Sequence, residues 1–199
     1  TGITTTTTIS SSTGTTTTTA FQPVALRSPG DLAYLIYTSG STGLPKGVRC
    51  HHGGSMNTVV DLNSRFGVGA GDRVLALSSL SFDLSVYDIF GSLAAGAAVV
   101  MPPSSSTNPP NPETWLSLIA KHRVTVWNTV PALMDLLVTY CELSGTRLPK
   151  SLRLVWMSGD WIPPSLPSRI RHLCTREGGI QIVSMGGATE AAIWSNLKE

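Results

Sequence analysis

Residues 32–48 read LAYLIYTSGSTGLPKGV, an apolar segment that runs directly into a loop of glycines, hydroxyls and one lysine. The apolar part, residues 32–37, is short and rich in aromatic and branched side chains, which predicts a buried β-strand. The glycines of the loop let backbone N–H groups approach anionic oxygens, and a lysine adds a compact positive charge. The spacing of the glycines and the lysine differs from that of the Walker phosphate-binding loop. We therefore predict a polyphosphate-binding loop that uses Thr38, Ser39, Gly40, Ser41, Thr42, Gly43 and Lys46.

Downstream of this loop the chain alternates between strand-like and helix-like segments. Short apolar runs predict strands at residues 74–77, 97–100, 124–127, 152–157 and 181–185. Helical periodicity predicts helices at residues 82–93, 112–122, 131–140 and 166–173, the second capped by Asn111. Strands that alternate with helices indicate an α/β fold, layered around a largely parallel sheet.

Composition narrows the class of protein. Of the 199 residues, 41% are hydrophobic and 13% charged, which is typical of a globular domain. The Thr/Ser-rich residues 1–30 show no strand or helix periodicity, so we expect a flexible leader followed by one domain over residues 31–199.

The net charge of +2 is too small for nucleic-acid binding, and no apolar stretch reaches the roughly 18 residues of a membrane span. Three widely spaced cysteines, Cys50, Cys141 and Cys174, indicate reduced thiols and a cytoplasmic location.

A second motif, SFDLSVYDIFG, occupies residues 81–91. Ser81 is a suitable helix cap, and Asp83 falls in the first helical turn, where a negative charge is favourable; this reading is purely structural. Asp83 and Tyr87 are also four residues apart, so they share one helix face and can line one pocket. In such a pocket Asp83 is suited to pair with an ammonium group.

A third motif, SMGGATE, follows a predicted strand at residues 184–190. The adjacent Gly186 and Gly187 permit a tight turn and the close approach of a base or a phosphate. Thr189 can donate to a phosphate oxygen, and Glu190 can hold Mg²⁺. The alternative is a glycine turn with a helix-capping threonine.

Together the three motifs resemble those of the adenylate-forming superfamily, and most closely the adenylation domains of nonribosomal peptide synthetases. The resemblance implies ATP and Mg²⁺ as cofactors, formation of an aminoacyl-AMP, and catalytic roles for Lys46, Thr189 and Glu190. It further implies a phosphopantetheine-bearing carrier domain and condensation or cyclisation domains in a larger synthase. Gly186 and Ala188 depart from the family's usual Tyr and Pro, which resembles the variant in cysteine-activating modules.

The resemblance also maps the family's amino-acid pocket onto this chain. The corresponding positions are Asp83, Leu84, Tyr87, Asn128, Trp156, Ser158, Met185, Ile193 and Trp194. All but Trp156 and Met185 agree with the cysteine-activating pattern, which implies cysteine as substrate. A tryptophan in place of leucine at position 156 would narrow the pocket.

The family's ribose-binding aspartate and its lid lysine lie downstream of the third motif. The resemblance covers residues 31–199, so we expect a partial domain with little activity of its own. Two alternatives stay open. One is a fragment of an acyl-CoA or acyl-AMP ligase, which Asp83 disfavours because such substrates carry no ammonium group. The other is a noncatalytic nucleotide-binding remnant, which the change at Gly186 favours.

Overall fold

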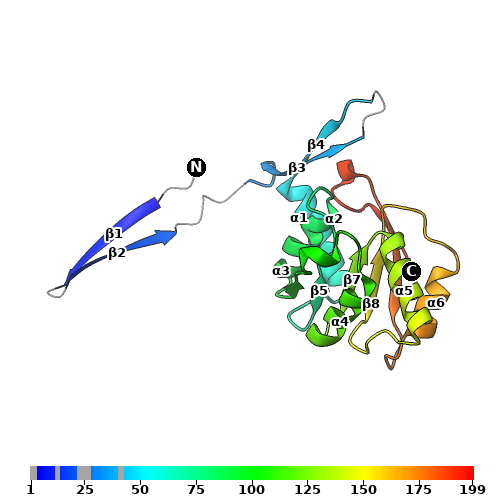
Figure 1. The fold of residues 1–199 in the computed structure, drawn as a ribbon. Helices are drawn as coiled ribbons and strands as arrows, with labels where there is room; N and C mark the ends of the chain where they lie inside the picture. Colours follow the sequence, from blue (N-terminus) through cyan, green and yellow to red (C-terminus); the bar gives the residue numbers. More distant parts are fainter. Residues whose placement is uncertain (1–3, 12–13, 22–27, 40–42) are drawn as a thin grey trace.

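The computed structural model describes residues 4–11, 14–21, 28–39 and 43–199, with side chains in the last two ranges. Its centre is a six-stranded sheet with the strand order β10-β9-β8-β7-β5-β6 (Figure 1). The strands from β5 to β9 are parallel, and β10 is antiparallel to β9. The predicted α/β class with a largely parallel sheet is confirmed. The strands are β5 (Arg73–Leu75), β6 (Ala98–Val100), β7 (Val126–Thr129), β8 (Leu154–Met157), β9 (Gln181–Gly186) and β10 (Asn196–Lys198).

Helices connect the strands. They are α1 (His52–Arg65), α2 (Leu84–Val86), η1 (Tyr87–Gly91), α3 (Ser92–Ala94), η2 (Ser104–Ser106), α4 (Pro112–His122), α5 (Pro131–Ser144), α6 (Leu166–Leu173) and η3 (Thr189–Ala191). The predicted cap of α4 is confirmed, because the Asn111 side chain accepts a hydrogen bond of 3.0 Å from the Thr114 amide. Gly145, with a φ of 66°, ends α5 in the left-handed conformation that glycine adopts freely.

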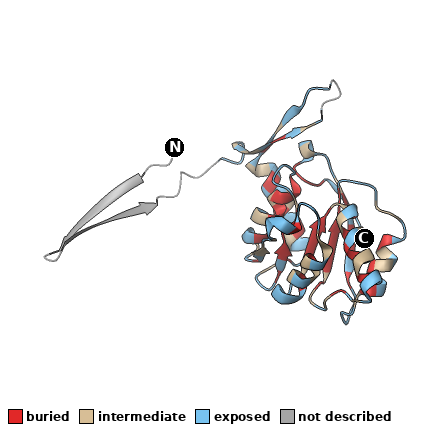
Figure 2. Ribbon diagram, in the orientation of Figure 1, coloured by how far each residue is buried: buried red, intermediate tan, exposed pale blue. Residues whose placement is uncertain are grey.

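Alternate residues of the central strands enter two separate cores. On one face, Val74, Val126 and Trp156 pack under α1 and the α2–η1–α3 segment. On the other face, Trp127 and Met157 pack under α4, α5 and α6. Because both faces of the sheet are covered, the central strands β7 and β8 are buried at every residue rather than at alternate ones (Figure 2).

The segment α2–η1–α3 is helical as predicted, but it turns a different face to the core. Of the apolar residues at helical spacing within residues 82–93, Phe82, Phe90 and Leu93 are exposed, while Tyr87 and Asp88 are fully buried. Contacts with α1 explain the difference, because Asn63 accepts a hydrogen bond from the Tyr87 hydroxyl (2.6 Å) and donates one to a backbone carbonyl of η1 (3.0 Å). The predicted cap at Ser81 is wrong, since the helix begins three residues later at Leu84.

The strand predicted at residues 32–37 exists as β3 (Leu32–Thr38), but it is not buried. It pairs antiparallel with β4 (Lys46–His51) in a two-stranded ribbon outside the six-stranded sheet. Only Ile36 of β3 is buried, and Leu35 and Tyr37 are exposed, because the ribbon does not lie between the two helix layers. The base of the ribbon is joined to η3 by a hydrogen bond of 3.2 Å from the Cys50 thiol to the Thr189 carbonyl.

The Thr/Ser-rich leader contains regular structure that the sequence did not predict. β1 (Thr4–Ser11) and β2 (Gly14–Phe21) form an antiparallel pair. Threonine is β-branched and favours extended backbone, which is consistent with strands in this segment. The flexibility of the leader stays a prediction. Among the described residues, no helix combines the length and the apolar character that crossing a membrane requires.

An ion pair fastens the amino ends of the central strands. Arg153, just before β8, donates from Nε and Nη2 to the two carboxylate oxygens of Asp72, each at 2.8 Å. Asp72 also accepts from the Thr125 hydroxyl (2.7 Å), and Arg153 donates to the carbonyls of Phe66 and Gly67. Burial alone would raise the pKa of Asp72, but these hydrogen bonds and the guanidinium charge hold the pKa below its usual value.

We expect Arg153→Met to lower the free energy of unfolding by about 3 kcal/mol at pH 7, because it leaves a buried carboxylate unpaired. The control, Arg65→Met, breaks the exposed pair with Asp61 and should cost about 0.5 kcal/mol. Urea unfolding measures both.

The folded-state pKa of Asp72 is depressed, so its stabilisation is present above the unfolded pKa of about 3.9 and is lost as pH falls through the folded pKa. The cost of Arg153→Met should therefore shrink below about pH 4. Equal destabilisation by the two variants at pH 7 would contradict a structural role for the pair.

Candidate functional site

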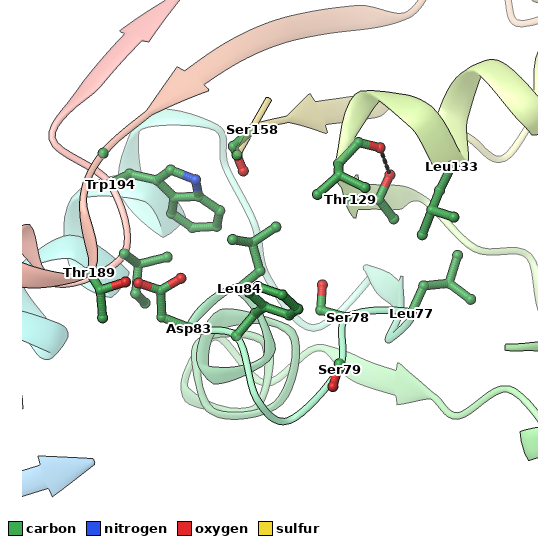
Figure 3. Close-up of a pocket in the computed structure, with 15 residues that line it drawn as sticks. Leu77, Ser78, Ser79, Asp83, Leu84, Thr129, Leu133, Ser158, Thr189 and Trp194 are labelled. Carbon is green, nitrogen blue, oxygen red and sulfur yellow. Dashed lines mark hydrogen bonds between the residues drawn. The ribbon is translucent and has the colours of Figure 1, made fainter. Parts of the chain in front are cut away.

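A cavity of about 340 Å³ opens at the carboxyl ends of β5, β7, β8 and β9 (Figure 3). In the sheet, β6 lies on one side of β5, whereas β7, β8 and β9 lie on the other side. The direction in which successive strands are added therefore reverses at β5. Open parallel sheets bind ligands at this kind of switch point. The lining residues are Leu77, Ser78, Ser79, Phe82, Asp83, Leu84, Thr129, Val130, Leu133, Ser158, Gly159, Gly187, Thr189, Ile193 and Trp194.

Among the described residues that line the cavity, Asp83 is the only ionisable one. Its burial raises the pKa of the carboxyl group, the nearby Thr189 side chain opposes the rise, and the negative charge of Glu190 adds to it. Figure 3 shows the Asp83 carboxylate and Thr189 facing each other at one side of the cavity. A buried carboxylate in this setting favours a cationic ligand, which would restore its ordinary ionisation.

The rest of the lining is mostly apolar, with a few polar groups. The Ser158 hydroxyl and the Trp194 indole nitrogen are buried and have no hydrogen-bond partner among the described residues. The Thr129 hydroxyl, in contrast, accepts from the Trp127 indole (2.7 Å) and donates to the Val130 carbonyl (2.9 Å). Because buried polar groups normally have partners, Ser158 and Trp194 are the groups best placed to contact a polar ligand.

Three predicted pocket residues lie behind the lining rather than in it. Tyr87 and Trp156 are fully buried and stack edge-to-face, with 4.8 Å between their ring centroids. The centroid of the Trp194 ring lies 5.5 Å from that of Tyr87 and 5.9 Å from that of Trp156. Met185 is buried in the same core. The expected sharing of one pocket by Asp83 and Tyr87 is therefore not seen, because α1 binds the Tyr87 hydroxyl on the far side. Tyr87 and Trp156 pack against Trp194, which lines the cavity.

Asn128, also a predicted pocket residue, is fully buried next to a residue that the sequence did not single out. Its side-chain amide donates to Asp88 at 2.8 Å, and the amide of the pocket residue Ser78 lies 3.4 Å from the other Asp88 oxygen. Burial raises the pKa of Asp88 to about 7, against the lowering effect of these two hydrogen bonds. The signal in the sequence was an acidic residue between the apolar residues of a helix.

The third motif forms the turn that carries one wall of the cavity. Gly187 and Thr189 line the cavity, Gly186 is half-buried at the end of β9, and Glu190 is exposed beside them. A Cβ atom at Gly187 would lie 2.7 Å from the Ile193 carbonyl oxygen. Ile193 itself has a φ of 81°, which a β-branched residue rarely adopts. Because it has no Cβ, Gly187 can lie close to the strained segment around Ile193, and both residues line the cavity.

The described residues of the predicted phosphate loop lie on or beside the ribbon and are not among the residues that line the cavity. Thr38 and Lys46 face each other across β3 and β4, and Lys46, Ser39 and Gly43 are exposed. Gly40, Ser41 and Thr42 lie outside the described residues. The contact between Cys50 and η3 ties the ribbon to the third motif.

Within the described ranges no cluster of three or more metal-binding side chains exists. The exposed carboxylate of Glu190 still fits Mg²⁺, which takes one or two carboxylates together with substrate phosphates.

The model of the family described as AMP-binding enzyme matches residues 3–199. The chain belongs to this family. The chain is 50% identical over 183 residues to the anguibactin system regulator of Vibrio anguillarum, covering 89% of the chain and 17% of that protein. It is 51% identical over 173 residues to pyochelin synthetase PchF of Pseudomonas aeruginosa, covering 87% of the chain and 9% of that protein.

Among solved structures, the chain is similar to the nonribosomal peptide synthetase FmoA3 in its AMPPNP-bound form. The TM-score is 0.81 at 45% identity, over 91% of the chain and 19% of the synthetase. The resemblance to peptide-synthetase adenylation domains, predicted from the three motifs, is confirmed. The chain spans less than a fifth of the length of each of these relatives.

We expect Gly187→Ala to lower the melting temperature of the chain by about 5 °C, because the added methyl group must displace backbone atoms of the opposing segment. The tryptophan fluorescence should change as well, since the alanine Cβ would also press on Trp194. Gly71→Ala is the control, because a Cβ there meets no atom within 4 Å. Unchanged fluorescence and melting in Gly187→Ala would show that the turn adapts without strain.

Proposed function

We propose that this chain takes part in amino-acid activation, in which ATP and an amino acid form an aminoacyl-AMP and pyrophosphate. The observation that carries the proposal is the single buried carboxylate, Asp83, in an otherwise apolar and hydroxyl-lined cavity. That arrangement suits the ammonium group of an amino acid. The solved relative FmoA3 binds AMPPNP in one structure and α-methyl-L-serine-AMP in another, which supports the same chemistry here.

In the proposed reaction a carboxylate oxygen of the amino acid attacks the α-phosphate of ATP, and pyrophosphate leaves. Asp83 binds the substrate ammonium, while Lys46, Thr189 and the loop residues bind phosphate oxygens. Glu190 would hold Mg²⁺, which supplies positive charge against the phosphates. The protein provides positions and charges rather than a nucleophile, so catalysis rests on orientation and electrostatic stabilisation.

The substrate side of the proposal is a small amino acid, with cysteine favoured. The pocket residues match the cysteine-activating pattern except at Trp156 and Met185, and both of these lie behind the lining. Leu84, Ile193 and Trp194 offer apolar walls that suit a thiol better than a hydroxyl.

We also propose that the aminoacyl group passes to a phosphopantetheine thiol on a carrier domain, within a cytoplasmic synthase that includes condensation or cyclisation domains. The support is the small share of each relative that this chain covers.

The first test is amino-acid-dependent exchange of labelled pyrophosphate into ATP, with the full synthase and with the chain alone. We expect exchange by the synthase and little by the chain alone. In the synthase, Asp83→Ala should reduce kcat/KM for the amino acid about 100-fold, because an unpaired substrate charge is left in an apolar pocket. The control Asp61→Ala, on the exposed face of α1, should leave exchange unchanged.

Because burial raises the pKa of Asp83, exchange should fall, as pH is lowered, at a higher pH than an ordinary aspartate predicts. No exchange with any amino acid, or exchange with a fatty acid alone, would refute amino-acid activation. The second result would favour an acyl-AMP ligase, and nucleotide binding without turnover would favour a noncatalytic remnant.

The second test compares kcat/KM for cysteine, serine, alanine and glycine in the same exchange reaction. We expect cysteine to lead serine by at least about tenfold, since the apolar walls leave a hydroxyl without partners. The margin over alanine should be smaller, because a missing sulfur removes contact without leaving a polar group unpaired. If alanine or glycine exceeds cysteine, the cysteine assignment is wrong while amino-acid activation stands.

A further inference from the structure

A second, larger basin lies at the opposite end of the sheet from the cavity with Asp83. It has a volume of about 720 Å³ and sits at the amino ends of β5, β7 and β8. The two linings share no residue. The lining of the basin is Gly67, Gly69, Gly71, Asp72, Arg73, Ala120, Arg123, Thr125, Pro149, Lys150, Ser151, Arg153 and Arg176.

The basin concentrates positive charge. It holds five of the fourteen lysine and arginine residues of the chain, against one of its twelve acidic residues. The chain as a whole carries a formal net charge of only +2, and outside the basin eleven acidic residues stand against nine lysines and arginines. Charged side chains that line one hollow reinforce one another's potential and attract ions of the opposite sign.

Only one of these cations is neutralised within the described residues. Arg153 is held by Asp72 and two backbone carbonyls, and so forms part of the wall. Arg73, Arg123, Lys150 and Arg176 are exposed and make no ion pair in the described part of the chain. These four are therefore available to a ligand.

One further group in the lining lacks a partner. The Ser151 hydroxyl is buried and makes no hydrogen bond to any described residue. A hydroxyl in this position can donate to an oxyanion that the surrounding cations attract.

We propose that this basin binds a compact ligand that carries two or more phosphate groups. Guanidinium groups match phosphate oxygens in a two-pronged geometry, and three of the four available cations are arginines. Four cations around one hollow exceed what a single phosphate neutralises, so the ligand carries several negative charges. The site is separate from the proposed adenylation site, and neither depends on the other.

The test is calorimetric titration of the full chain with inorganic tripolyphosphate at low salt. The basin variant Arg73→Gln/Arg123→Asn/Lys150→Gln removes three charges, with asparagine chosen at position 123 because the backbone there is left-handed. The matched control Arg49→Gln/Arg171→Gln/Lys198→Gln removes three exposed charges outside the basin. We expect the basin variant to bind about tenfold more weakly and the control to bind within about twofold of the unmodified chain.

Three further arms make the result specific. Lys46→Gln separates the basin from the phosphate loop, and weaker binding in this variant alone would overturn the proposal. Titration with ADP identifies the source of the phosphates: binding equal to that of tripolyphosphate supports a free polyphosphate, and tighter binding supports a nucleotide. Equal binding by the basin and control variants, or preference for a poly-glutamate peptide, would also overturn the proposal. If thermal melting shows that the basin variant is unfolded, Lys150→Gln alone provides the same comparison.

Discussion

The ion pair between Asp72 and Arg153 is the constraint on which both ends of the sheet depend. It joins the start of β5 to the start of β8, and through Thr125 it includes the start of β7. Parallel strands are stiff and hydrogen-bonded to their neighbours, so fixing their amino ends also sets where their carboxyl ends lie. The cavity at the carboxyl ends and the basin at the amino ends are thus two consequences of one alignment. The pair also neutralises the one acid of the basin and so leaves the other cations in excess.

Asp83 and Asp88 are only five residues apart, but their different positions in the fold give them different roles. Asp88 is fully buried and is bonded to Asn128 and the Ser78 amide, so it organises the floor beneath the cavity. Asp83 lies just before the helix and faces the cavity, with Thr189 as its neighbour (Figure 3). Burial raises the pKa of both carboxyls, but only Asp83 can meet a ligand. The aromatic layer of Tyr87, Trp156 and Trp194 supports this arrangement from the α1 side.

Much of the fold could be predicted from local patterns, because strand length, helix caps and apolar runs are encoded within a few residues. The strands β5 to β9 and the Asn111 cap are of this kind. The buried face of α2–η1–α3 could not be predicted from periodicity, because Asn63 on another helix provides the partner that makes Tyr87 burial favourable.

The candidate site divides in the same way. Motif resemblance identified Asp83, Ser158 and Trp194, which line the cavity, but it could not separate them from Tyr87 and Trp156 one layer behind. The basin gave no sequence signal, since its cations are dispersed between positions 73 and 176.

The strand order has a consequence for how the chain folds. The second neighbour of β5 in the sheet is β7, which follows β6 and α4 in the sequence. The contacts of Asp72 with Thr125 and Arg153 span 53 and 81 residues of the chain. Closing loops of that length costs entropy before any sheet contact repays it, so domains rich in such contacts fold slowly. One edge of β5 therefore stays unpaired until β7 and β8 have been synthesised and have packed onto the sheet. During translation, this is the interval in which the exposed edge of β5 most needs protection from pairing with other chains.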